Sequence, residues 1–187
     1  VVLLGPRQSG KTTLARELFP DFAYVSLEDP DVRLQATEDP RSFLAREPIR
    51  SLILDEVQRA PELLSYLQSI LDDPTNTRRF VLTGSHNLLL AEKVAQTLAG
   101  RTRLFTLLPL SNRELFDSHA YTEQSLDERM FFGGYPRIYD KKLNPTEWLG
   151  QYYATYVERD VRAVSNIGDL DTFDRFVRLL AGRVGQL

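Results

Sequence analysis

The chain has 187 residues, of which 42% are hydrophobic and 26% charged, a composition typical of a globular protein with one domain or one domain and an appendage. Cysteine is absent, so there is no disulfide framework or thiolate metal site, and the two histidines do not have metal-ligand spacing. The net charge of −3 does not indicate a nucleic-acid partner. We see no signal peptide and no apolar run of about 18 residues, so we expect a cytoplasmic protein.

A glycine-rich motif follows the first apolar run. Val1–Leu4 precedes Gly5-Pro-Arg-Gln-Ser-Gly-Lys-Thr12, which has the G-x-x-x-x-G-K-T spacing of a phosphate-binding loop. Thr12–Phe19 then has a helical pattern, and the positive N-terminal end of that helix would face the phosphates. Strand, loop and helix in this order argue against a chance glycine-rich turn. We therefore predict a nucleotide site formed by Gly5, Pro6, Arg7, Gln8, Ser9, Gly10, Lys11, Thr12 and Thr13.

Two side chains of this loop have specific expected roles. Lys11 can reach the β- and γ-phosphates as a mobile charge, and the Thr12 hydroxyl can hold Mg²⁺. The terminal glycines allow the backbone to curl so that its N–H groups point at phosphate oxygens. A nucleotide with bound Mg²⁺ is the ligand that this chemistry predicts.

Further apolar segments alternate with helical patterns along the next hundred residues. Strands are expected at residues 23–27, 51–56, 79–85 and 103–108. Two short helices separated by Pro40 are expected over residues 31–47, and longer ones over about 61–71 and 87–98. This alternation predicts an α/β fold with a parallel, doubly wound sheet. Ligands of such sheets bind at the carboxyl ends of the strands, where three of the motifs meet.

Two adjacent carboxylates, Asp55 and Glu56, end the aliphatic strand expected at residues 51–56. Asp55 can hold Mg²⁺ through its water shell opposite Thr12. Glu56 is the candidate general base that orients and polarises the attacking water. A pair of surface acids is the alternative interpretation, but its position at the end of a buried strand favours function.

Four further polar residues have weaker signals. Ser85 or Thr83 can contact the γ-phosphate or the attacking water, or can instead cap the helix that begins near Asn87. Arg101 can act in trans on a neighbour's γ-phosphate, which would require a homo-oligomer, or can complement the end of the preceding helix. Arg137, after the turn at Gly133-Gly-Tyr-Pro136, is a weaker candidate for contact with nucleotide.

The character of the chain changes after Leu110, where only helical patterns remain. Residues 146–164 and 171–181 have amphipathic periodicity, and their aromatic residues favour core packing over base stacking. We therefore expect an α/β nucleotide-binding core over residues 1–110 and a smaller helical segment over residues 111–187. The chain opens inside a core strand and closes without a terminal element, so we expect it to be part of a longer protein.

Several motifs occur together in one order. They are Gly5-Pro-Arg-Gln-Ser-Gly-Lys-Thr-Thr-Leu-Ala15, Ile53-Leu-Asp-Glu-Val-Gln-Arg-Ala-Pro-Glu-Leu-Leu64, Leu82-Thr-Gly-Ser85, Leu98-Ala-Gly-Arg101 and Leu107-Leu-Pro-Leu-Ser111. This order resembles a prokaryotic family of predicted AAA-type ATPases, of the AAA+ superfamily, with a C-terminal domain of unknown function. Gly133-Gly-Tyr-Pro136, Glu158-Arg-Asp160 and Leu180-Ala-Gly-Arg183 resemble the start of that second domain.

The resemblance implies a P-loop NTPase core with a five-stranded parallel sheet in the order 5-1-4-3-2. It also implies ATP with Mg²⁺, hydrolysis that uses Glu56, a sensor position at Thr83–Ser85 and an arginine-finger position at Arg101. The effector of such a protein is not indicated by these residues.

The leading hypothesis is an ATPase that couples hydrolysis to a conformational change between the α/β core and the helical segment. A nucleotide-gated switch with negligible turnover is the alternative, favoured by the lack of any visible substrate site. A small-molecule kinase is disfavoured, because the Asp55-Glu56 pair includes a water-activating carboxylate that a kinase does not need.

Overall fold

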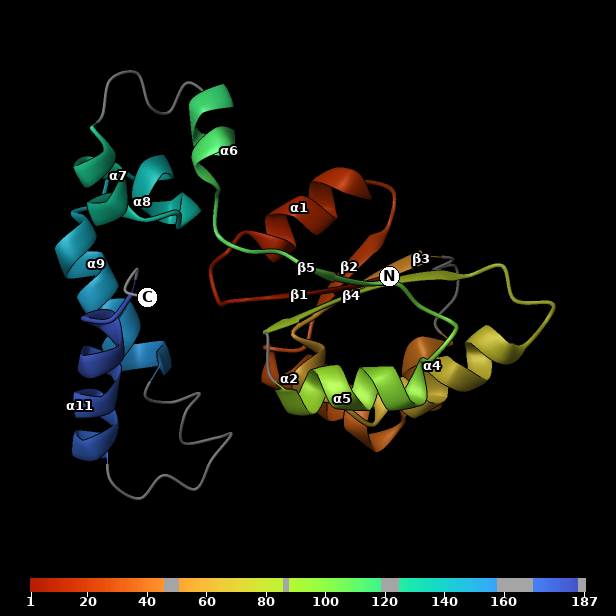
Figure 1. Ribbon diagram of the computed structural model, residues 1–187. Coiled ribbons are helices and arrows are strands. Elements are labelled where there is room, and N and C mark those ends of the chain that lie inside the picture. Colours follow the sequence, from red (N-terminus) through yellow and green to blue (C-terminus); the bar gives the residue numbers. More distant parts are fainter. Residues whose placement is uncertain (46–50, 86–87, 119–124, 158–169, 185–187) are drawn as a thin grey trace. The chain divides into compact units, whose positions relative to one another are not determined.

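A computed structural model of the protein describes residues 1–45, 51–85, 88–118, 125–157 and 170–184 (Figure 1). The chain forms two compact units, Val1–Lys142 and Leu143–Leu187. The helix start predicted at Asn87, the motif Glu158-Arg-Asp160 and the predicted helix end at residue 164 lie outside the described residues.

The first unit contains a five-stranded sheet in which every pairing is parallel. Its strands are β1 (Val2–Gly5), β2 (Ala23–Ser26), β3 (Ser51–Asp55), β4 (Arg79–Ser85) and β5 (Leu104–Thr106). Their order in the sheet is β2-β3-β4-β1-β5, which is 5-1-4-3-2 from the other edge. The predicted fold class and strand order are confirmed.

Helices connect the strands as the alternating pattern predicts. In chain order they are α1 (Lys11–Leu18), α2 (Pro30–Glu38), α3 (Pro40–Leu44), the 3₁₀ turn η1 (Val57–Arg59), α4 (Leu63–Asp72) and α5 (Leu88–Thr97). Pro40 separates α2 from α3, because proline cannot continue the hydrogen-bond ladder of a helix. Asp39 ends the first helix and caps the second, where its side chain accepts from the Ser42 N–H.

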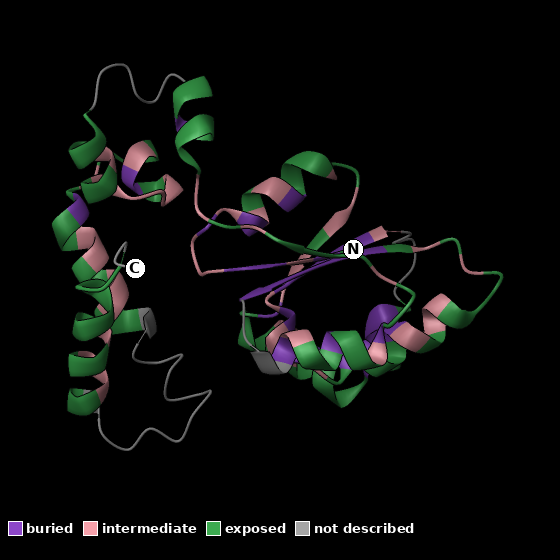
Figure 2. Cartoon of the chain, viewed as in Figure 1, coloured by how far each residue is buried: buried purple, intermediate pink, exposed green. Residues whose placement is uncertain are grey.

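The two faces of the sheet are covered unequally. Figure 1 shows α2, α4 and α5 on one face and α1 on the other. The larger core lies on the first of these faces and includes Leu54, Leu64 and Leu82. The smaller core lies under α1, where Ala15 packs with Ile53 and Val81. The central strands are therefore buried on both faces, as their purple colour in Figure 2 indicates, which explains why their sequences are almost continuously apolar.

The edge strand β5 differs from the central ones. Its residues are exposed, with Leu104 at 48% and Phe105 at 51%. Backbone bonding nevertheless holds it against β1, since the Val2 N–H donates to the Arg103 oxygen at 2.9 Å and the Leu107 N–H to the Leu4 oxygen at 2.7 Å. The apolar sequence of β5 predicts a strand but does not by itself predict this exposure.

Strand register brings the carboxyl ends together. Gly5 is the partner of Ser85 in the pairing of β1 with β4, and Ser26 is the partner of Asp55 in the pairing of β2 with β3. Because β3 also pairs with β4, the ends of four strands form one edge. The chain after β1 leaves this edge as the glycine-rich loop and enters α1.

Three short helices complete the first unit: α6 (Asn112–Asp117), α7 (Leu126–Phe132) and α8 (Pro136–Asp140). Ser111 caps the start of α6, where Ser111 and Glu114 make a reciprocal capping box. A second capping box begins α7 at Ser125. Gly133, at φ 67°, ends α7 in a conformation that favours glycine.

A close backbone approach ties the start of α8 to the segment after β5. The Leu110 N–H donates to the Gly134 oxygen at 2.7 Å. A Cβ atom added at Gly134 would lie 2.3 Å from the Leu110 oxygen, a distance at which one of the two segments must move. Gly134 thus allows the turn before α8 to lie against Leu110.

We expect Gly134→Ala to lower the free energy of unfolding by about 1–3 kcal/mol, the usual cost of overpacking. Gly150→Ala is the matched control, because nothing lies within 4 Å of a Cβ at that helical position, and it should be neutral or slightly stabilising. Urea unfolding followed by circular dichroism measures both. An unfolding midpoint for Gly134→Ala equal to that of wild type would contradict the close approach.

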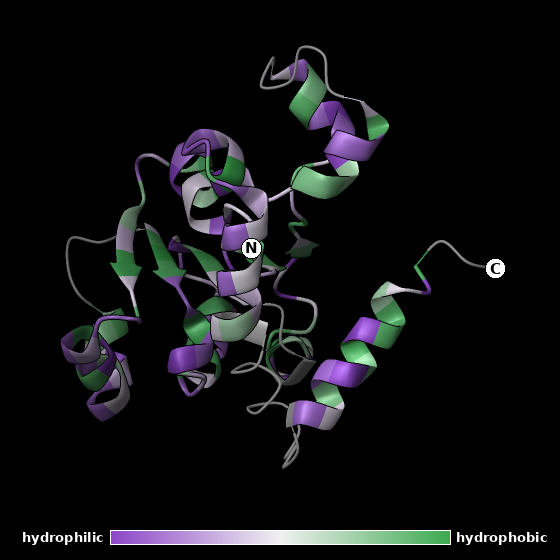
Figure 3. Cartoon of the chain, turned by 90° about the vertical axis from the view of Figure 1, so that its left-hand side faces the viewer, coloured by the Kyte–Doolittle hydropathy of each residue, from purple (hydrophilic) through white to green (hydrophobic). Residues whose placement is uncertain are grey.

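The second unit contains α9 (Pro145–Tyr152), the π-helical turn η2 (Tyr153–Val157) and α11 (Leu170–Ala181). The α-helical form of the first helix ends at Tyr152, whereas the sequence predicts an amphipathic helix over residues 146–164. Trp148 and Tyr152 stack at 5.3 Å on α9. Helix α11 matches its predicted range, and Figure 3 shows apolar and polar residues alternating along it.

Candidate nucleotide-binding site

The glycine-rich loop lies between β1 and α1. Gly10 is the N-cap of α1 and has a left-handed φ of 95°, and no side chain caps the helix start. The first N–H groups of an α-helix have no partner within the helix, so they are available to an anion. The Ser9 side chain is 3% exposed, and its hydroxyl oxygen is buried without a hydrogen-bond partner. A buried polar atom of this kind, beside a helix N-terminus, fits a loop that holds phosphate.

Lys11 lies inside the loop and is 4% exposed. Its Nζ donates to the Gly5 oxygen at 3.1 Å and to the Pro6 oxygen at 2.6 Å. Burial lowers the pKa of Lys11, while the carboxylates of Glu56 and Asp55 oppose that shift. The ammonium group is thus held between the loop carbonyls and two acidic side chains.

Hydroxyl groups from three different elements converge on Asp55 at the end of β3. Thr12 Oγ1, at the start of α1, lies 3.1 Å from Oδ1 and 3.0 Å from Oδ2 of the carboxylate. The Tyr24 hydroxyl of β2 donates to Oδ2 at 2.8 Å. The Thr83 hydroxyl of β4 donates to Oδ1. Asp55 itself is 5% exposed, so its carboxylate is oriented from three sides.

The donors at this edge suit a magnesium ion that also binds phosphate. Among the residues that the structure describes, no group of three or more His, Cys, Asp or Glu side chains could hold a metal. Magnesium is typically bound through one or two carboxylates together with substrate phosphates. The Thr12 hydroxyl and the Asp55 carboxylate are hard oxygen donors that fit this pattern.

Glu56 follows Asp55 in an unusual backbone conformation. Its φ is 58° and its ψ 46°, in the left-handed region that residues other than glycine seldom adopt. Burial raises the pKa of Glu56, and the positive charge of Arg7 acts in the opposite direction. Because the left-handed turn ends β3 abruptly, the carboxylate of Glu56 leaves the strand beside that of Asp55.

Gln58 is a residue of this site that the sequence analysis did not single out. Its Nε2 donates to Glu56 Oε2 and lies 3.4 Å from Ser85 Oγ. A Cβ at Gly84 would lie 2.7 Å from Gln58 Oε1, so the glycine in β4 leaves room for this side chain. The amide therefore connects the end of β3 with the end of β4. Only its position two residues after Glu56 offered a signal in the sequence.

Ser85 and Thr83 have different surroundings at the end of β4. Thr83 is 0% exposed and bonds Asp55, which places its hydroxyl beneath the candidate metal ligand. Ser85 is 7% exposed and contacts Gln58. Of the two alternatives for a sensor, these contacts favour Ser85. The capping alternative concerns the position just before α5, which lies outside the described residues.

A cavity of about 670 Å³ lies over the loop. Its lining includes the loop and start of α1, Glu56, the segment after β5, and α8, and we call it the phosphate-loop cavity. A volume of this size is within the range of small-molecule sites. Arg137, at the start of α8, lines it together with Lys11, while Leu107 and Leu110 give it an apolar part. The structure thus brings Arg137 into the same cavity as the glycine-rich loop.

Arg101 does not share this cavity. It precedes β5, which runs parallel to β1, and therefore lies at the amino edge of the sheet. There it pairs with Asp72 at the end of α4, with Nη2 2.9 Å from Oδ2, and donates to the Ala99 oxygen at 2.9 Å. Within one chain, Arg101 lies at the amino ends of the strands, whereas the glycine-rich loop lies at their carboxyl ends.

Residues 1–116 match the AAA domain family, and residues 123–187 match a domain of unknown function (DUF8612). The first match covers more than half of the chain, so the protein belongs to the AAA domain family. The boundary between the two parts differs with the criterion. The sequence predicts it after residue 110, the family matches place it between residues 116 and 123, and the compact units divide after Lys142.

Curated relatives occur in bacteria and archaea. Uncharacterized proteins of Mycobacterium bovis and Mycobacterium tuberculosis are each 33% identical over 190 residues, which cover 100% of this chain and 42% of theirs. An uncharacterized protein of Methanocaldococcus jannaschii is 24% identical over 196 residues, covering 90% of this chain and 44% of its own. The chain therefore spans less than half the length of the curated relatives it matches. In the described part of the chain, no helix combines the length and apolarity that crossing a membrane requires.

Proposed function

We propose that the protein binds Mg-ATP in the phosphate-loop cavity and hydrolyses it. The observation that carries this proposal is the meeting of the glycine-rich loop, Asp55 and Glu56 at one edge of the sheet, reached from two different strands. A phosphate-binding loop, a metal ligand and a candidate base are the parts that NTP hydrolysis needs. Membership of the AAA domain family supports nucleotide as the ligand. Phosphate release from ATP tests the proposal.

The residues of the loop bind the phosphates in this proposal. Backbone N–H groups of the loop and of the first turn of α1 surround the phosphate oxygens, and the Ser9 hydroxyl supplies a further donor. Lys11 contributes a positive charge that is already buried among acceptors. Bound phosphate would replace carbonyl partners of Lys11 with a stronger, charged one.

Thr12 and Asp55 are the residues that would hold Mg²⁺. The ion, when bound, neutralises negative charge on the phosphates. The hydroxyl cluster around Asp55 keeps the carboxylate in one orientation, so its contribution is prepared before ligand arrives.

Glu56 would hold the attacking water and accept its proton. A raised pKa makes a carboxylate a stronger base while it remains ionised, and burial raises the pKa of Glu56. Ser85, linked to Glu56 through Gln58, is suited to sense the γ-phosphate. Arg137 and the other residues of α8 would close over the nucleotide from the side of the helical segment.

A nucleotide-gated switch with negligible turnover is the second candidate. The contact that favours it is the bond from Gln58 to Glu56, which engages one of the two oxygens of the candidate base. Tight ATP binding with a very low rate of phosphate release would support this candidate over the first, provided that the rate per chain does not change with protein concentration.

We also propose that residues 1–110 act as the catalytic core and residues 111–187 as a helical lid followed by the start of a C-terminal domain. The lining of the phosphate-loop cavity by α8 supports a lid role for this region. Hydrolysis would then alter the contacts that α8 makes with the loop. These residues do not indicate which partner would respond to this change.

A trans role for Arg101 makes a quantitative prediction. If subunits complete each other's sites, the turnover per chain should rise with protein concentration, and Arg101→Ala should remove that rise while leaving ATP binding intact. Arg41→Ala, an exposed arginine on α3, is the control. Phosphate release measured across a wide range of protein concentration checks this. A turnover per chain that does not change with concentration in wild type, or a rise that persists in Arg101→Ala, would contradict the trans role. The ion pair with Asp72 would then be the remaining role of Arg101.

A further inference from the structure

We propose that Tyr24 is a positioning residue of the magnesium site, acting through Asp55 rather than on the metal or nucleotide. This inference rests on the proposed function, since it concerns the same site. Tyr24 belongs to β2, the edge strand of the sheet, and forms no part of the glycine-rich motif or of the acidic pair. Only the pairing of β2 with β3 brings it to Asp55.

The contact is specific. Tyr24 donates its hydroxyl hydrogen to Asp55 Oδ2 at 2.8 Å, whereas Thr83 donates to the other oxygen. Thr12, the third donor, is itself a candidate metal ligand. Tyr24 and Thr83 are therefore the two groups that orient the carboxylate from outside the metal shell, one on each oxygen. Groups of this kind fix the direction and the basicity of a metal ligand.

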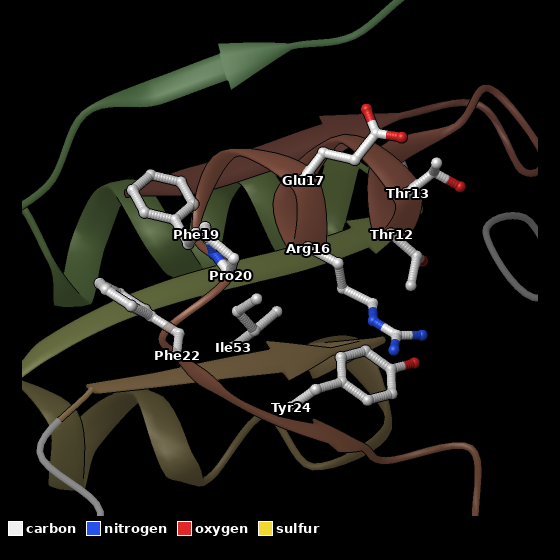
Figure 4. Close-up of a pocket in the computed structure, with 9 residues that line it drawn as sticks. All are labelled: Thr12, Thr13, Arg16, Glu17, Phe19, Pro20, Phe22, Tyr24 and Ile53. Carbon is white, nitrogen blue, oxygen red and sulfur yellow. The ribbon is translucent and has the colours of Figure 1, made fainter.

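Tyr24 is held in turn from its own side. The guanidinium of Arg16 lies 4.9 Å from the centre of the Tyr24 ring, in the arrangement of a cation–π pair. Figure 4 shows the Arg16 side chain descending from α1 toward the ring, with Thr12 beside it. The ring is 38% exposed, so this contact and the bond to Asp55 restrain a side chain that packing alone does not enclose.

Tyr24 also lines a second cavity, which shares Thr12, Thr13 and Glu17 with the phosphate-loop cavity. This cavity of about 420 Å³ lies between α1 and the surface of β2 and β3, with Phe19, Phe22 and Ile53 at its apolar end (Figure 4). Arg16 and Tyr24 form its polar end, next to Thr12. The candidate metal ligand Thr12 lines both cavities, so the metal site lies beside this second space as well as beside the phosphate-loop cavity.

The test measures metal affinity directly. Tyr24→Phe removes the hydroxyl and keeps the ring, and Tyr66→Phe, an exposed tyrosine on α4, is the matched control. Mn²⁺ binding to the ADP-loaded protein is followed by electron paramagnetic resonance, and ADP affinity is measured separately in EDTA. We expect Tyr24→Phe to weaken Mn²⁺ binding by about tenfold or more, the usual effect of losing an outer-shell partner. ADP affinity in EDTA and the melting temperature should stay close to wild type.

The outcomes separate this inference from the proposed function. If the Mn²⁺ affinity of Tyr24→Phe lies within about twofold of wild type, the positioning role is overturned. A change that small is well below the loss expected when an outer-shell partner is removed. An equal loss of ADP affinity with and without metal would also overturn it, because that pattern indicates a general structural role. Failure of the wild-type protein to bind ADP in either condition would instead overturn the proposed function, and the inference with it.

Discussion

Replacing Lys11 by alanine should lower ATP affinity by about tenfold to a hundredfold, the range expected for one charge-assisted hydrogen bond to phosphate. The buried ammonium lies between the carbonyls of Gly5 and Pro6, inside the loop that follows β1. No other lysine among the described residues lines the phosphate-loop cavity, and the other cation that lines it, Arg137, belongs to α8 rather than to the loop. Isothermal titration with ATP and Mg²⁺ measures the loss.

Stability distinguishes this effect from damage to the fold. Burial lowers the pKa of Lys11, which means that the folded protein disfavours its charged form. We therefore expect Lys11→Ala to melt at or above the wild-type temperature. Lys93→Ala, at an exposed position of α5, should change neither binding nor melting. Wild-type ATP affinity in Lys11→Ala would remove the lysine from the phosphate site.

Replacing Glu56 by glutamine should reduce phosphate release by about 10²–10⁴-fold, the usual contribution of a general base. An amide cannot accept the proton of the attacking water, so turnover should stop while the nucleotide still binds. Glutamine has nearly the same shape, and its side-chain oxygen can still accept the bond from Gln58 that Glu56 Oε2 accepts. A single-turnover measurement of phosphate release beside an ATP titration separates the two effects.

The control for this variant is Glu62→Gln, an exposed glutamate just before α4. It should keep both binding and turnover at the wild-type level. Undiminished turnover in Glu56→Gln would take Glu56 out of the base role. A loss of ATP binding in proportion to the loss of turnover would also contradict it, because a base acts after binding.

Much of the fold follows from patterns that are local in the chain. The apolar runs that end at Gly5, Asp55 and Ser85 indicate strands buried on both faces, and helical periodicity fills the intervals between them. Alternation of this kind leads to parallel pairing and to ligand sites at the carboxyl edge. The strand order came from the resemblance to AAA-type ATPases.

The residues that sequence reasoning missed depend on pairing between distant segments. Tyr24 reaches Asp55 across the pairing of β2 with β3, and no motif marks it. Gln58 reaches Ser85 because Gly84 leaves space in a strand that is distant in sequence. Arg101 pairs with Asp72, which joins the turn before β5 to the end of α4. Neither of the two predicted roles for Arg101 includes this contact.

The helical part was harder to predict for a different reason. Periodicity predicts one amphipathic helix from residue 146, but α9 ends at Tyr152 and passes into the π-helical turn Tyr153–Val157. A π-helical turn has i→i+5 hydrogen bonds in place of i→i+4 bonds, and the apolar periodicity of the sequence does not mark where that change occurs. The position of Arg137 in the phosphate-loop cavity likewise depends on the close approach of Gly134 to Leu110.

The most direct test of the central claim is the rate of phosphate release from ATP by the purified protein, measured with Mg²⁺ and with EDTA at a concentration that saturates binding. The account predicts release that requires Mg²⁺ and that disappears in Glu56→Gln while bound ATP remains. Tight binding of ATP without any Mg²⁺-dependent release would contradict hydrolysis by this site.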